Sequence, residues 1–165
     1  GLVGSEMCIR DSQYESELSE ERPTLCANPA VDALAGHYDH EAHSLGVPVD
    51  WRLELPRQLA IPEADFCMML GNLLENAFHA SQKLPPEQRQ VKVMARMLSP
   101  AMLGLLVENR YDGVLKRQQG TLHSTKHDGM GIGLVSIQTA VSRYGGSMTV
   151  ETENCLFRVN ILLNL

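Results

Sequence analysis

Long runs of basic residues are missing from this chain. Its 165 residues carry 20 acidic and 14 basic side chains, which give a formal net charge of -6 and a pI near 5.5. Proteins that hold nucleic acid by its phosphates need clustered Lys and Arg to neutralise that charge. We therefore expect no nucleic-acid partner, and the acidity itself mainly favours solubility.

Paired cysteines are missing as well. The four cysteines form no Cys-x-x-Cys pair and have no histidine partner at zinc-finger spacing: Cys8, Cys26, Cys67 and Cys155. This spacing argues against the common structural zinc sites. We expect reduced thiols and an intracellular setting.

No apolar stretch approaches the roughly 18–20 residues that a membrane-spanning helix needs. If the parent protein is membrane-bound, we expect its anchor to lie outside this sequence. Hydrophobic residues make up 44% and charged residues 21% of the chain, which is close to the globular average. The length fits one domain with a real hydrophobic core.

The first twelve residues, GLVGSEMCIRDS, match nothing that follows in period or composition. They resemble the adapter read-through found at the ends of some assembled sequences, and we expect residues 1–12 to be non-native. The alternative is a natural flexible terminus. In either case we expect the native chain to continue upstream.

Hydrophobic periodicity and turn residues predict an alternation of helices and strands along the rest of the chain. Helices are predicted near residues 30–44, 62–83 and 133–144, and strands near 47–55, 90–98, 103–108, 148–151 and 156–163. The intervening residues 111–130 are polar and without period, as functional lids or disordered loops are. This order predicts an α+β protein with a mostly antiparallel or mixed sheet.

The helix near residues 62–83 carries an unusual polar stripe. At about 100° per residue, four side chains fall within an arc of roughly 60°; they are Asn72, Asn76, His79 and Lys83. The opposite side is apolar and predicts the core face, with Phe66, Leu70, Leu73, Leu74 and Ala77. Burying an unpaired amide costs about 1–3 kcal/mol, so the asparagines call for a polar partner. The alternative is that they cap nearby backbone or face solvent.

A glycine-rich segment, DGMGIGL, spans residues 128–134 and opens the last predicted helix. Gly129, Gly131 and Gly133 allow an anion to approach backbone N–H groups at a helix start. The spacing is neither the dinucleotide fingerprint nor the P-loop pattern. Thr125 and Lys126, just before it, offer a hydroxyl and an ammonium for phosphate.

Together these segments resemble the GHKL superfamily, which includes gyrase, MutL and the sensor histidine kinases. NLLENAFH is similar to the kinase N box and GMGIGL, ending at Leu134, to the second glycine box. The resemblance covers about residues 28–165. LCANPAVDALAGHY, followed by a strand and then DFCMMLGNLLENA, resembles the branch related to quorum-sensing receptor kinases. The resemblance implies a two-layer α/β sandwich, the Bergerat fold, with a mixed sheet covered by helices on one face.

The resemblance also implies ATP and Mg²⁺, with a role for each polar residue of the N box. Asn76 would give its amide oxygen to Mg²⁺, a hard cation that prefers oxygen ligands. Asn72 would lie beside the metal, His79 near the phosphates, and Glu75 would act indirectly. Hydrolytic relatives place a general-base Glu at the position of Asn72. An amide cannot accept that proton, so transfer of the γ-phosphoryl group to a histidine is favoured over hydrolysis.

The chain departs from the family at the box that recognises adenine. The usual Asp-x-Gly-x-Gly is replaced by VENRYDG. Either Asn109 takes the place of the carboxylate, or Asp112 and Gly113 have shifted into the role. An amide oxygen accepts from the adenine amino group more weakly than a carboxylate does.

The resemblance divides the chain into the end of a dimerisation or linker region, residues 13–46, and an ATP-binding catalytic domain, residues 47–165. No phosphoacceptor histidine is evident, since His37, His40 and His43 lack the acidic context of the family's histidine box and are best explained as a solvated face. Spacing of i, i+3, i+6 also disfavours a zinc site.

The implied partners are a missing upstream helix that carries the acceptor histidine, a response regulator and a second copy of the chain. The implied location is a cytoplasmic domain of a membrane-anchored protein, and the fragment alone is expected to be inactive. Two alternatives remain: an anti-sigma-type Ser kinase, disfavoured by the region upstream of the domain, and a non-catalytic ATP-sensing or partner-binding module.

Overall fold

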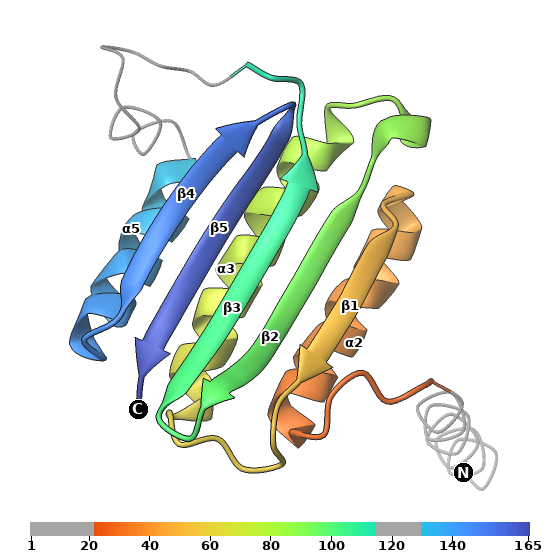
Figure 1. The fold of residues 1–165 in the computed structure, drawn as a ribbon. Coiled ribbons are helices and arrows are strands. Elements are labelled where there is room, and N and C mark those ends of the chain that lie inside the picture. The colour runs from red at the N-terminus through yellow and green to blue at the C-terminus, as the bar shows by residue number, and fades with distance from the viewer. Residues whose placement is uncertain (1–21, 115–129) are drawn as a thin grey trace, which may run out of the picture.

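The computed structural model describes residues 22–114 and 130–165. These residues form a single sheet with all of its α-helices on one face, as Figure 1 shows. The helices are α2 (Pro29–Leu45), α3 (Glu63–Gln82) and α5 (Met130–Arg143), with a short 3-10 turn η1 (Pro86–Gln88), and the strands are β1 (Val49–Glu54), β2 (Val91–Ser99), β3 (Met102–Arg110), β4 (Ser147–Glu153) and β5 (Leu156–Asn164). The predicted α+β, two-layer sandwich is confirmed.

The sheet is mixed, with the strand order β1-β2-β3-β5-β4. β1 pairs with β2 in parallel, and the remaining neighbours are antiparallel. The parallel pair requires a crossover, and α3 provides it behind the sheet (Figure 1). The crossover places α3 behind the centre of the sheet, where Asn76, alone of its predicted polar stripe, lines a pocket with residues of β3 and β5.

Local signals in the sequence explain where the helices begin and end. Asn28 caps α2 by accepting a 3.0 Å hydrogen bond from Val31 N, and Pro29 occupies the first turn. Gly46 ends the same helix in the left-handed region, with φ 67°. After α5, Gly146 packs so close to β5 that a Cβ would lie 2.1 Å from Leu162 O.

The hydrophobic core lies between the sheet and the helices. β3 and β5 alternate buried and more exposed residues, so one face of each strand packs on α3 and α5. The predicted core face of α3 is confirmed, because all five of its residues are buried: Phe66, Leu70, Leu73, Leu74 and Ala77.

Helix α2 packs on α3 at the side away from α5 (Figure 1). Its Val31, Ala35 and Ala42 belong to the same core cluster as the sheet residues. The functional division of the chain at residue 46 stays a prediction. No helix among the described residues is long and apolar enough to cross a membrane.

Most predicted element boundaries lie within about three residues of the observed ones. The start of α5 differs in one respect that matters for the site. The helix was predicted to begin near residue 133, but it begins at Met130 and so includes both Gly131 and Gly133. Glycine lowers helix propensity but does not forbid the conformation in a first turn. The two glycines are therefore part of the helix N-terminus itself.

Candidate functional site

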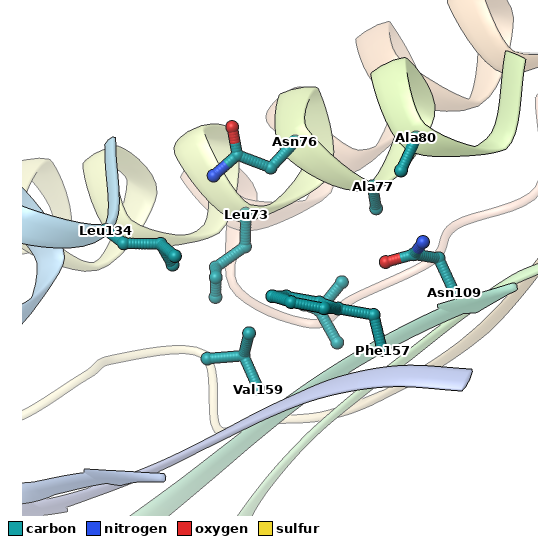
Figure 2. Close-up of a pocket in the computed structure, with 9 residues that line it drawn as sticks. Leu73, Asn76, Ala77, Ala80, Asn109, Leu134, Phe157 and Val159 are labelled. Carbon is teal, nitrogen blue, oxygen red and sulfur yellow. The ribbon is translucent and has the colours of Figure 1, made fainter. Parts of the chain in front are cut away.

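A small pocket lies where α3 and α5 face the ends of β3 and β5 (Figure 2). Both helices and both strands contribute side chains to it. The lining residues are Leu73, Asn76, Ala77, Ala80, Val107, Asn109, Leu134, Phe157 and Val159. Apolar walls with two amides among them are typical of a ligand site in which a few polar groups fix the orientation.

Asn76 places an unpaired amide in this pocket. Its Nδ2 atom is buried and has no hydrogen-bond partner. Leu73 and Ala77, which line the pocket beside Asn76, are buried, so the Asn76 side chain lies next to the hydrophobic core. An unsatisfied amide costs about 1–3 kcal/mol, and a polar ligand or a metal ion would remove that cost. Rotation of the amide by half a turn exchanges its nitrogen and oxygen, so the site fits either a hydrogen-bond acceptor or a cation.

Asn109 faces the same pocket from β3. It is only 3% exposed, and its Nδ2 atom donates a 3.0 Å hydrogen bond to Arg110 O. That bond directs the amide oxygen toward the interior of the pocket, as Figure 2 shows. The pocket therefore presents a fixed acceptor that suits an amino group on a ligand.

Asp112 and Gly113 lie outside this pocket. Asp112 is exposed and its Oδ1 atom accepts a 2.8 Å bond from Val114 N, which is a local turn contact. Asp112 lines a neighbouring hollow together with Cys155, and Gly113 is exposed with φ 80°. Of the two alternatives for the adenine position, only Asn109 lies in the same pocket as Asn76.

The three residues predicted to be catalytic are on α3 but do not line the pocket. Asn72 donates a 3.3 Å bond to Met68 Sδ, one turn earlier in the helix. Glu75 is exposed and accepts a 2.9 Å bond from the Tyr38 hydroxyl on α2. His79 is exposed. Their predicted roles near the phosphates stay predictions.

The glycine box meets the pocket at the start of α5. Leu134, 5% exposed, forms part of the wall. Gly131 and Gly133 are in the first turn of the helix, where backbone N–H groups have no intrahelical partner and favour an anion. Thr125, Lys126 and Gly129 lie outside the described residues, so their predicted contacts remain predictions.

The pocket is nearly closed. Its cavity measures ≈ 10 Å³, about the space of one water molecule, against about 300–1,000 Å³ for typical ligand pockets. A nucleotide base can enter only when the walls move apart. Helix α5 is one of those walls and follows directly on residues 115–129.

Ionisable groups are scarce at the pocket itself. Among the described residues, no group of three or more His, Cys, Asp or Glu side chains is arranged to hold a metal ion. Any metal bound here would depend on amide oxygens and on oxygens of the nucleotide or other ligand bound with it.

Tyr38, on α2, has a raised pKa. Burial raises this pKa, and the hydrogen bond to Glu75 raises it further. The Tyr38 hydroxyl therefore stays protonated and remains a donor.

Sequence analysis missed several residues of this region. Phe157 and Val159 lie on β5. The sequence predicted this strand, but it did not indicate that the buried face of the strand lines a pocket with α3. Tyr38 lies on the helix predicted near residues 30–44, but no pattern in the sequence links it to α3. Gly71, in the interior of α3, was the available signal, because a mid-helix glycine usually marks close packing.

The fold and the pocket together define a class: a two-layer α/β sandwich with an amide-bearing central helix facing a glycine-containing helix start. A family model described as a GHKL domain matches residues 62–164. The chain therefore belongs to the GHKL family.

A curated relative is the sensor protein TdiS of Thauera aromatica, which is 23% identical over 151 residues. The match covers 87% of this chain and 27% of TdiS, so the chain spans about a quarter of that relative.

Solved structures share the fold. The mycobacterial sensor histidine kinase MprB is 17% identical with a TM-score of 0.57, and the match covers 82% of this chain and 93% of that one. The catalytic domain of histidine kinase ThkA is 14% identical with a TM-score of 0.60, over 82% and 90%. Full-length ShkA in complex with AMPPNP is 18% identical with a TM-score of 0.60, over 81% and 29%. The predicted resemblance to sensor histidine kinase catalytic domains is confirmed.

Proposed function

We propose that this GHKL domain binds Mg·ATP and passes the γ-phosphoryl group to a histidine on a helix upstream of the described residues. The observation that carries the proposal is the unpaired amide of Asn76, which shares one pocket with the fixed acceptor Asn109 and the first turns of α5. Membership of the GHKL family and similarity to sensor histidine kinases support the choice of nucleotide.

Each wall of the pocket has a distinct part in binding. Asn109 accepts a hydrogen bond from the amino group of adenine, and the apolar side chains around it, such as Leu73 and Phe157, cover the base. Asn76 offers an amide oxygen to Mg²⁺, which supplies neutralisation of phosphate charge when it is bound. The first N–H groups of α5 face the phosphates.

The composition of the pocket favours transfer over hydrolysis. None of its described lining residues is acidic, so the lining offers no carboxylate to take a proton from an attacking water. Phosphoryl transfer depends mainly on positioning and charge stabilisation, which amides and helix N–H groups can supply. An acceptor histidine delivered by another segment then completes the reaction.

The wider assignments belong to the same proposal. Similarity to the longer proteins TdiS and ShkA supports additional segments in the parent protein. We infer that these include the acceptor helix, that the parent protein is a homodimer serving a response regulator, and that this domain is cytoplasmic in a membrane-anchored protein. The fragment by itself is then inactive for lack of an acceptor.

The test is the variant Asn76→Ala. We expect it to abolish Mg²⁺-dependent ATP binding, measured by calorimetry, and phosphotransfer to a separately supplied acceptor domain. Asn160→Ala, on the opposite face of the sheet, is the matched control and should bind as the unaltered chain does. Unchanged Mg²⁺-dependent affinity in Asn76→Ala would show that the metal assignment is wrong.

A second candidate is a non-catalytic module that binds ATP without transferring phosphate. The replacement of the adenine-binding carboxylate by Asn109 and the nearly closed cavity favour it. Binding of Mg·ATP without transfer to any supplied histidine acceptor would select this candidate. Transfer to a serine of a supplied partner would select the Ser-kinase alternative.

A further inference from the structure

A tyrosine on α2 holds a carboxylate that lies next to Asn76 on α3. The Tyr38 hydroxyl donates a 2.9 Å hydrogen bond to Glu75 Oε1. Glu75 directly precedes Asn76, so one turn of α3 carries a residue bound by α2 and a residue facing the pocket. Neighbouring helix positions point about 100° apart, so fixing the direction of one also fixes the direction of the other.

The Tyr38 hydroxyl reaches this position because Gly71 has no side chain. A Cβ at Gly71 would lie 3.3 Å from the Tyr38 hydroxyl oxygen, which is tighter than ordinary van der Waals contact. Glycine weakens the interior of a helix, so close packing gives a physical reason for its presence here. Gly71 and Glu75 are four residues apart and form one surface of α3 toward α2.

The ring of Tyr38 is also held in place. It is 8% exposed and packs edge-on against Phe78 of α3, with ring centroids 6.0 Å apart. Tyr38 therefore contacts α3 through its hydroxyl and through its ring. These contacts restrict the rotation of α3 about its own axis in the turns that contain Asn76.

We propose that Tyr38 is a positioning residue, which fixes through Glu75 the rotation of α3 that directs the Asn76 amide into the pocket. The inference rests on the proposed role of Asn76 as the magnesium-binding residue. A cavity of ≈ 10 Å³ leaves the amide little room to compensate for a rotated helix. Loss of the Tyr38 contact should therefore affect the metal-dependent part of nucleotide binding more than the rest.

The test is Tyr38→Phe, which removes only the hydroxyl. Binding of a fluorescent trinitrophenyl-ATP to the 165-residue chain is measured across a Mg²⁺ titration and again in EDTA. We expect the Mg²⁺ concentration at half-saturation to rise about threefold to tenfold, which is the size of one ordinary hydrogen bond, because Glu75 is exposed and water screens its charge. Affinity in EDTA should change less than about twofold. Gly71→Ala should act in the same direction, because its methyl group displaces the hydroxyl.

A matched control exists on the same helix. Tyr144, which directly follows α5, donates its hydroxyl to Asp65 in the first turn of α3, away from the pocket. Tyr144→Phe should lower the melting temperature as much as Tyr38→Phe does, without raising the Mg²⁺ requirement. This contrast separates a role in positioning from a role in stability alone.

A double-mutant cycle tests whether Tyr38 acts through Glu75. If it does, Glu75→Ala and the double variant with Tyr38→Phe should show the same Mg²⁺ shift as Tyr38→Phe alone. Additive shifts, equal weakening with and without Mg²⁺, or no change in Tyr38→Phe would each overturn the inference while the proposed function stands. A complete lack of Mg²⁺-dependent binding in the unaltered chain would instead remove both.

Discussion

Two asparagines, one on the α2 side of the molecule and one on the α5 side, differ in how their amides are paired. Asn28, on the α2 side, is fully buried; it accepts from Val31 N and donates to Arg57 O at 2.9 Å and to Glu63 Oε1 at 3.0 Å. Asn76, on the α5 side, has a buried amide nitrogen with no partner. Buried polar groups are normally paired. Among the described residues, the two unpaired side-chain atoms are Asn76 Nδ2 and Ser81 Oγ, and of these only Asn76 lines the pocket, where we propose that a ligand binds.

The rest of the α2 side follows the pattern of Asn28. Trp51 Nε1 donates to Asp39 Oδ1 at 2.8 Å and joins β1 to α2. Arg89 donates to three carbonyl oxygens, including Leu45 O at the end of α2 and Gln82 O at the end of α3. The α2 side is therefore held by paired polar groups, whereas the pocket on the α5 side contains an unpaired amide.

The largest effect on stability is expected from Asn28→Ala. This change removes the cap of α2 and leaves Arg57 O and one Glu63 oxygen without a bond that they now receive. We expect the free energy of unfolding to fall by about 2–4 kcal/mol, measured by urea denaturation.

Asn28→Ser serves as the control, since a neutral hydroxyl can keep the cap acceptor and loses at least one of the two donated bonds. It should fall between the unaltered chain and Asn28→Ala. A loss below about 0.5 kcal/mol in Asn28→Ala would mean that this region is not held by its paired polar groups.

A smaller effect is expected from Arg89→Met, which keeps the apolar stem but removes the guanidinium. The last carbonyl groups of α2 and α3 then lose donors, and we expect a loss of about 1–3 kcal/mol in the free energy of unfolding. Arg89→Lys keeps the charge without the fork of donors, and should recover less than half of the loss. Full recovery by Lys would show that charge alone, and not the geometry of the bonds, stabilises the two helix ends.

Local features of this fold could be predicted from the sequence, whereas its long-range contacts could not. Helix boundaries, the Asn28 cap and the core face of α3 follow from local periodicity and from residues within one turn of each other. The bond from Tyr38 to Glu75 joins residues 37 positions apart, and the bond from Asn28 to Glu63 joins residues 35 apart. No local pattern specifies which of many possible long-range partners meet.

The candidate site shows the same limit. The arc on α3 grouped Asn72 with Asn76, yet only Asn76 lines the pocket, because Asn72 lies one turn earlier and bonds to Met68. The choice between Asn109 and Asp112 for adenine stays a prediction, but the end of β3 separates the two residues: Asn109 lies on the buried face of the strand and lines the pocket, whereas Asp112 lies beyond its last residue, Arg110. Where a strand ends depends on its pairing in the sheet, and a single stretch of sequence does not encode that pairing.

The smallest effect on stability, and the sharpest test of the comparison, is expected from Asn76→Ala. The change deletes an amide whose nitrogen is unpaired and places a better helix former in α3, so no hydrogen bond to that nitrogen is lost. We expect the free energy of unfolding to stay within about 0.5 kcal/mol of the unaltered chain in urea denaturation without nucleotide, or to rise slightly. Asn28→Ala, the same chemical change on the other side of α3, provides the contrast. A loss in Asn76→Ala as large as that in Asn28→Ala would mean that the pocket amide already has a protein partner in solution, and the contrast between the two asparagines would then disappear.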